Sequence, residues 1–165
     1  MTNTLRKPLA DAVFMTVNGA RLIADPSGVA YWPDESVLLV SDLHFEKGSA
    51  YAARGQLLPP YDTRATLQRL AAAIMLYQPE SVIALGDSFH DLGADGRMAP
   101  DDAETLSALV ASVQDWLWIE GNHDPEPPAR FGGRAGFELA LGPLHLRHEP
   151  QPGARPGEVA GHLHP

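Results

Sequence analysis

The sequence predicts an α/β fold built on a buried parallel sheet, and two observations support this prediction. Short apolar runs at residues 37–40, 81–85 and 116–119 are bounded by turn-forming residues, which is the pattern of fully buried strands. Two segments of helical period lie between these runs, at about 62–77 and about 101–113. The alternation of strand and helix indicates right-handed crossovers between parallel strands.

The first of these helices has Asp62 or Thr63 as its expected N-cap, because both side chains can accept a hydrogen bond from the first turn. Before the sheet, residues 12–17 and 20–24 flank Asn18-Gly19, the strongest short signal for a β-hairpin. Further strands are predicted at 29–32, 137–141 and 144–147, and loops at 92–100, 125–136 and 151–157.

The composition is that of an ordinary globular chain, with 165 residues of which 44% are hydrophobic. It has no apolar run long enough to span a bilayer and no apolar region after Arg6 and Lys7, so we expect no membrane association and a cytoplasmic location. The absence of cysteine excludes disulfides and thiolate metal sites.

The net charge of −9, from 12 basic and 21 acidic residues, argues against a broad basic surface for nucleic acid. It does not exclude a nuclease, because divalent ions would neutralise clustered carboxylates and one local basic patch would suffice. The seven histidines are more informative than the net charge. None lies in the first 43 residues, and nearly all follow an apolar run or adjoin a glycine.

Side chains that can bind metal ions follow each of the three buried strands. They are Asp42 and His44 after the first strand, Asp87 after the second, and Asn122 and His123 after the third. The carboxyl ends of parallel strands meet at one edge of a sheet, where α/β proteins bind ligands. Burying such groups without partners would cost several kcal/mol each, and metal ions supply partners. Mixed carboxylate, amide and imidazole ligands suit Mn, Fe or Zn better than Ca or Mg.

The ordered motifs resemble those of the calcineurin-like metallophosphoesterases. These motifs are Asp42-Leu43-His44, Gly86-Asp87, Gly121-Asn122-His123-Asp124, His148 and Gly161-His162-Leu163-His164. The resemblance implies a four-layer α/β/β/α sandwich of two mixed sheets with flanking helices. It also implies one domain over residues 1–165 that lacks the C-terminal strands and tail with which family members usually continue.

The same resemblance implies two divalent metal ions, with Mn²⁺ as the expected metal and Fe or Zn as alternatives. The implied ligands are Asp42, His44 and His164 for the first ion, Asp87 as the bridge, and Asn122, His148 and His162 for the second. His145 competes with His148 on the same predicted strand. The place of His148 at the strand end, before Glu149-Pro150, favours it.

Catalytic and substrate-binding roles follow from the resemblance in the same way. His123 would act as general acid or as a donor to the phosphoryl oxygen, and Asp124 would orient it. Lys47 and Arg54 lie in a loop that should overhang the site, and we expect them to contact backbone phosphates. His90 is either a substrate contact or a structural residue of its loop.

Longer stretches around the motifs resemble the ligase-associated DNA damage response endonucleases. These stretches are residues 41–48, 58–63, 86–91 and 161–165. This narrower resemblance implies a DNA endonuclease linked to DNA repair, with single-stranded DNA as substrate and a DNA ligase and a helicase as partners. Two alternatives stay open: a phosphatase or phosphodiesterase on small nucleotides or other phosphoesters, and a non-catalytic protein-binding scaffold. A scaffold would have decayed ligands, whereas every ligand position is filled here.

Overall fold

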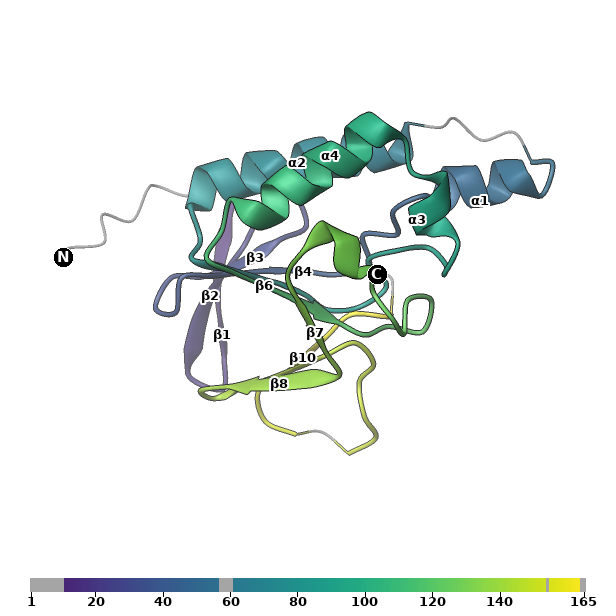
Figure 1. Cartoon of the computed structure of the whole chain (residues 1–165). Coiled ribbons are helices and arrows are strands. Elements are labelled where there is room, and N and C mark those ends of the chain that lie inside the picture. The colour runs from purple at the N-terminus through teal and green to yellow at the C-terminus, as the bar shows by residue number, and fades with distance from the viewer. Residues whose placement is uncertain (1–10, 57–60, 154, 164–165) are drawn as a thin grey trace.

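The computed structural model describes residues 11–56, 61–153 and 155–163, and in this part of the chain two β-sheets pack face to face. The larger sheet has seven strands in the order β1-β2-β3-β4-β5-β6-β7, and the smaller has three in the order β10-β9-β8. Figure 1 shows helices α2 and α4 against the face of the larger sheet that points away from the smaller one.

The larger sheet joins an antiparallel half to a parallel half. Its strands are β1 (Val13–Val17), β2 (Ala20–Ala24), β3 (Ala30–Trp32), β4 (Val37–Val40), β5 (Ser81–Ala84), β6 (Asp115–Ile119) and β7 (Arg134–Gly136). Pairing is antiparallel from β1 to β4 and parallel from β4 to β7. The β1–β2 turn has positive φ at both Asn18 (45°) and Gly19 (89°), which confirms the predicted hairpin.

The smaller sheet is also mixed. Its strands β8 (Glu138–Leu141) and β9 (Leu144–Arg147) are antiparallel, and β10 (Glu158–Ala160) runs parallel to β9. The two mixed sheets with flanking helices confirm the predicted α/β class.

The described helices are α1 (Lys47–Ala53), α2 (Asp62–Tyr77), α3 (Ala94–Arg97), α4 (Pro100–Ala111) and the 3₁₀ helix η1 (Ala129–Phe131). They lie on the outer side of the larger sheet (Figure 1), so the described residues form three of the four expected layers. The outer face of the smaller sheet carries Arg147, paired with Glu138 at 2.6 Å and Glu158 at 3.6 Å.

Two hydrophobic cores explain why the central strands are continuous apolar runs. Alternate residues of β4 face opposite ways: Leu38 and Val40 pack against the helices, whereas Val37 and Leu39 pack against the smaller sheet. In a strand that is buried on both faces, side chains on either face must be apolar. The carboxyl ends of β4, β5 and β6 lie at one edge of the larger sheet, and this shared edge carries the candidate site.

Some elements differ from the sequence prediction. Helix α3 lies in the predicted loop 92–100, η1 and β7 lie in the predicted loop 125–136, and β10 was not predicted. Each is only three or four residues long. The strands β7 and β10 are extended because they pair with β6 and β9, which are distant in sequence.

The N-cap of α2 also differs from the prediction. It is Tyr61, and no side chain caps the helix. The carboxylate of Asp62 instead accepts a hydrogen bond from the backbone N–H of Gly48 at 2.8 Å, in the first turn of α1. Asp62 therefore bonds to α1 and not to the first turn of its own helix.

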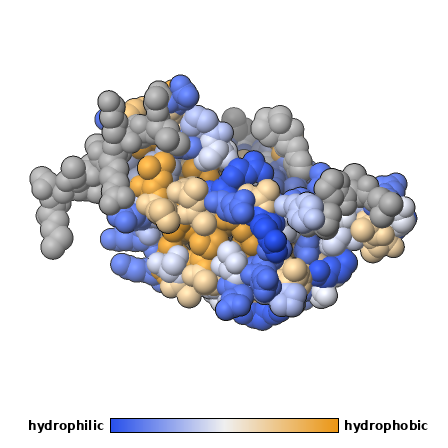
Figure 2. Space-filling view, turned by 90° about the horizontal axis from the view of Figure 1, so that it is seen from above, coloured by the Kyte–Doolittle hydropathy of each residue, from blue (hydrophilic) through white to orange (hydrophobic). Residues whose placement is uncertain are grey.

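The helical side of the molecule carries an apolar area bordered by hydrophilic side chains (Figure 2). On α2, the side chain of Met75 is 74% exposed. Among the helices that the structure describes, none combines the length and the apolarity needed to cross a bilayer.

Candidate metal centre

The chain segments after β4 and β5 stay side by side beyond the ends of the strands. Asp42 N–H donates to the carbonyl of Gly86 at 3.1 Å, and His44 N–H donates to that of Asp87 at 3.0 Å. Regular pairing nevertheless stops at Val40, because Asp42 (φ 51°), His44 (φ 48°) and Asp87 (φ 48°) are left-handed. These turns, rather than a continued strand, aim the side chains at one region.

Left-handed backbone is concentrated at this edge of the sheet. Eight described residues other than glycine have positive φ, and four of them are expected ligands: Asp42, His44, Asp87 and His162. The left-handed region is uncommon for residues with a side chain, and Asp and His are among those that tolerate it best. Clustered strain of this kind marks functional sites.

Two motif glycines let the ligand segments approach one another. A Cβ on Gly86, whose φ is +85°, would overlap the ring of His148. A Cβ on Gly161 would overlap the hydroxyl of Ser41 and lie 2.6 Å from Oδ2 of Asp42. Gly86, before Asp87, and Gly161, before His162, are therefore required, because the segments that follow β4, β5, β9 and β10 pack too closely for a side chain.

One group of potential ligands contains Asp42, His44 and Asp87, whose ligand atoms lie within 4.8 Å of one another. Asp42 Oδ1 lies 3.9 Å from His44 Nε2. The other oxygen, Oδ2, accepts hydrogen bonds from the hydroxyl of Ser41 at 2.5 Å and from the backbone N–H of His162 at 3.0 Å. These two donors fix the orientation of the Asp42 carboxylate toward His44.

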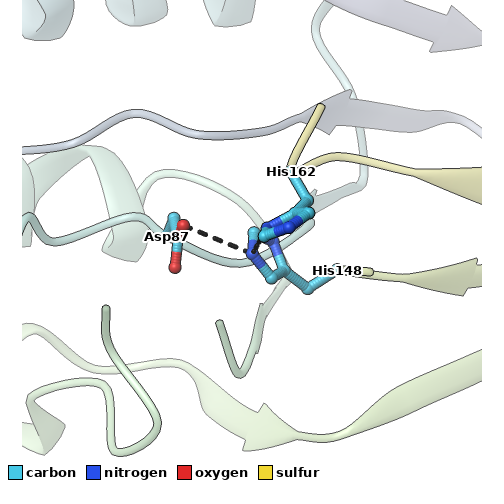
Figure 3. Close-up of side chains that lie close together, drawn as sticks. All are labelled: Asp87, His148 and His162. Carbon is cyan, nitrogen blue, oxygen red and sulfur yellow. Dashed lines mark hydrogen bonds and ion pairs between the residues drawn. The ribbon is translucent and has the colours of Figure 1, made fainter. Parts of the chain in front are cut away.

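A second group contains Asp87, His148 and His162 (Figure 3). His148 Nε2 lies 3.3 Å from Asp87 Oδ2 and 3.3 Å from His162 Nδ1. The Nδ1 atom of His148 lies 2.9 Å from the carbonyl oxygen of Leu85. Because a carbonyl only accepts hydrogen bonds, Nδ1 carries the proton, and in the neutral ring Nε2 keeps its lone pair. This is the arrangement that histidine ligands of metals adopt.

Asp87 belongs to both groups and is only 1% exposed. Its Oδ1 accepts a hydrogen bond from the backbone N–H of His123 at 2.8 Å. Its Oδ2 faces His148 at 3.3 Å and His123 Nε2 at 3.9 Å. The carboxylate therefore lies between the two groups, at the position that a bridging ligand needs.

Asp124 does not orient the ring of His123, which corrects the expectation from the motif. Its carboxylate is buried and accepts four backbone N–H groups at 2.8–3.2 Å, from Asp87, Ser88, Phe89 and Gly121. Each oxygen accepts two of these bonds, so the carboxylate is saturated. Burial raises the pKa of Asp124 to about 6, although these N–H groups oppose the rise. Asp124 instead holds the segment that carries Asp87 against the segment that carries His123.

Three histidine rings gather at the mouth of the site. The ring of His123, half exposed, stacks on that of His90 at a centroid distance of 5.6 Å. The ring of His44 meets both edge-on, at 5.9 Å from His90 and 5.7 Å from His123. Burial lowers the pKa of His90, and the positive charges of Lys47 and Arg54 add to this effect. The two cations therefore act on the same side of the site.

Lys47 and Arg54 lie at the two ends of α1, and both are exposed. Arg97 ties this helix to the site: its Nε donates to Ser49 Oγ at 3.0 Å, and its Nη2 donates to Asp91 Oδ1 at 2.9 Å. The sequence did not single out Arg97, because only the fold brings Ser49 and Asp91 together.

The remaining expected residues have different positions. Asn122 is exposed and lines, with His148, a cleft of about 180 Å³. His145 of β9 pairs across the strands with Ala140 and Glu158 and belongs to neither group of potential ligands, whereas His148, directly after β9, faces Asp87. His164 lies outside the described residues.

Comparison with known proteins agrees with this geometry. The sequence profile of calcineurin-like phosphoesterases matches residues 36–162. This chain belongs to the calcineurin-like phosphoesterase family. As a calcineurin-like phosphoesterase, it is a metal-dependent hydrolase of phosphate esters. A comparison with curated proteins gave no match.

A solved structure similar to this calcineurin-like phosphoesterase is that of the Pseudomonas putida nuclease MPE. It has a TM-score of 0.75 and 30% sequence identity, over 93% of this chain and 74% of that chain. The donor atoms described above also fit the divalent ions that the family uses. Carboxylate oxygens and imidazole nitrogens converge in two groups, and the proton on Nδ1 of His148 leaves Nε2 free to bind.

Proposed function

We propose that this calcineurin-like phosphoesterase is an endonuclease that hydrolyses phosphodiester bonds in single-stranded DNA. The observation that carries the proposal is the pair of ligand groups that share Asp87 at the carboxyl edge of the parallel strands. Two metal ions about 3.5–4 Å apart with a shared carboxylate are the arrangement of many phosphodiesterases and nucleases. The likeness to a nuclease supports a nucleic acid as the substrate.

We assign the ligands as follows: Asp42, His44 and His164 for the first ion, Asp87 as the bridge, and Asn122, His148 and His162 for the second. Mixed oxygen and nitrogen donors favour Mn²⁺, with Fe or Zn as alternatives, over Ca²⁺ or Mg²⁺. Bound divalent ions would lower the pKa of a water molecule and neutralise charge on the phosphate.

The protein's own groups then position and protonate the substrate. His123, half exposed beside Asp87, is free to donate a proton to the leaving alkoxide or to a phosphoryl oxygen. His90 supports the ring of His123 by stacking and faces the same space. Lys47 and Arg54, presented by α1, contact the phosphates that flank the scissile bond.

The resemblance to the ligase-associated DNA damage response endonucleases also suggests a cellular role. A single-strand endonuclease that acts with a DNA ligase and a helicase belongs in DNA repair, in the cytoplasm of a bacterium. The test of this part is co-purification of the full chain with a ligase or a helicase from its own host. A ligase or helicase found equally with the Asp87→Ala variant and with unrelated bait proteins would contradict a specific partnership.

The activity itself is tested with the purified full chain and Mn²⁺. We expect cleavage of single-stranded DNA and of bis-p-nitrophenyl phosphate, a phosphodiester. Activity on the monoester p-nitrophenyl phosphate alone would contradict the proposal and identify a phosphatase. Cleavage of circular single-stranded DNA distinguishes an endonuclease from an exonuclease, because a circle offers no end.

Variants separate metal binding from proton transfer. Asp87→Ala should abolish both metal binding and turnover, whereas His123→Ala should keep the metal and lose rate by about 10²–10⁴-fold. His148→Ala and His145→Ala form a matched pair, because His145 lies in β9 and His148 directly after it, and His148 is the one that faces Asp87. Loss of Mn²⁺ in the His145 variant, or full rate in the His123 variant, would show that the assignment is wrong.

A further inference from the structure

A cleft that adjoins the candidate metal centre is lined partly by residues with no role in the function proposed so far. It has a volume of about 180 Å³, and its lining includes Asn122 and His148, both assigned above to the second ion. The cleft is also lined by Phe137, which is 72% exposed. Among the exposed large apolar side chains of the described residues, Phe137 is the one that lines this cleft, so its ring is available to pack against a ligand bound there.

The backbone on both sides of Phe137 is held by strand pairing. The residue lies between β7 and β8, where the chain passes from the larger sheet to the smaller one. On one side Gly136 pairs with Ile119 and accepts a hydrogen bond from Glu120 N–H at 2.9 Å. On the other side Glu138 pairs with Arg147. Because the backbone that carries Phe137 is already ordered, a ligand that packs on the ring does not have to order this segment.

The charged side chains of the cleft disfavour a phosphate and are compatible with a neutral ring. Three carboxylates line it, those of Glu120, Glu138 and Glu149. Arg147 is the one arginine or lysine among the described lining residues, and it is held by Glu138 at 2.6 Å. The cations Lys47 and Arg54 act near His90 instead, on α1. A bound strand would therefore place its phosphates toward α1 and a base toward Phe137.

We propose that this cleft is a subsite for one nucleobase, which stacks on Phe137 next to the scissile phosphate. The proposal rests on the endonuclease activity proposed above and specifies how the single strand is held. The volume of about 180 Å³ suits one base; it is smaller than the roughly 300–1,000 Å³ of pockets that enclose drug-sized ligands. Stacking on an aromatic ring is sequence-tolerant, so the subsite selects an unpaired base and does not read a sequence.

The test compares two substrates on the full chain with Mn²⁺. One is a single-stranded oligonucleotide, and the other is the same backbone with tetrahydrofuran abasic residues at the internal positions. Phe137→Ala should raise KM for the oligonucleotide about tenfold, in the range of a base-stacking contact, and leave kcat unchanged. It should leave KM for the abasic strand unchanged, and Phe137→Trp should keep the wild-type KM on both.

Met75→Ala is the matched control, because Met75 is as exposed as Phe137 but lies near the end of α2, at the opposite edge of the sheet. An unchanged KM in Phe137→Ala, or an equal rise on both substrates, would overturn the base subsite and leave the endonuclease standing. A wild-type protein that hydrolyses p-nitrophenyl phosphate but not single-stranded DNA would overturn both proposals.

Discussion

Asp124→Asn tests whether Asp124 holds the site together or takes part in catalysis. Asparagine has almost the same shape as aspartate but keeps only one acceptor oxygen. Two of the four backbone N–H groups that bond to Asp124 would then face an amide NH₂ group. At about 1–3 kcal/mol for each buried donor left unsatisfied, the substitution should lower the free energy of unfolding by about 2–6 kcal/mol.

The assay is urea unfolding in EDTA, so that bound metal does not contribute. With a denaturant slope of about 1–3 kcal/mol per molar urea, the midpoint should fall by about 1 M or more. Asp34→Asn is the control, because it makes the same chemical change at an exposed turn. The reasoning is refuted if the Asp124 variant unfolds at the wild-type midpoint while kcat collapses. That result would return Asp124 to the role of orienting His123.

Three further predictions concern the surroundings of the site. Gly161→Ala should weaken Mn²⁺ binding at least tenfold in calorimetric titration while the far-UV circular dichroism stays native, because the added Cβ would displace the segment from Ser41; unchanged affinity would contradict the close packing. Tyr77→Phe should cost about 1–2 kcal/mol at pH 7, because Tyr77 donates a 2.5 Å hydrogen bond to Asp25. Burial would raise the pKa of Asp25, but this bond and those from Ser27 hold the pKa below its usual value of 3.8. The cost of Tyr77→Phe should therefore shrink as the pH falls below about 4, where Asp25 becomes protonated. A cost that stays constant in acid would argue against the bond. Arg97→Gln should raise KM for DNA several-fold with metal affinity unchanged, because it releases α1 from the site; an unchanged KM would show that α1 does not bind the strand.

The main elements of the fold could be predicted because local patterns and tertiary packing agree there. The helix at about 62–77 has an apolar face at helical spacing and forms as α2 (Asp62–Tyr77). The three apolar runs become the parallel strands β4, β5 and β6, which are buried on both faces. Where an element depends on a distant partner, as β7 depends on β6, three residues of sequence carry too little pattern.

In the candidate metal centre, too, some features follow from local sequence and others depend on contacts between distant segments. That Asp42, His44 and Asp87 would meet followed from the shared edge of parallel strands, and the structure brings them together. Their left-handed backbone did not follow from local sequence, because it depends on bonds between the segments after β4 and β5. The role of Asp124 was missed for a similar reason: its neighbour in sequence is His123, but its partners lie mostly in another loop.

The two ligand groups draw on both sheets, and this has a thermodynamic consequence. Asp42 and Asp87 follow strands of the larger sheet, whereas His148 and His162 follow β9 and β10 of the smaller one. An ion held by both sets would cross-link layers that pack through one apolar core and are joined at the site by hydrogen bonds from His148 and His162. The folded state then gains stability with the logarithm of free metal, by about 2.7 kcal/mol at a hundred times the dissociation constant. Metal supply in the cell would thus govern the lifetime of this protein as well as its turnover.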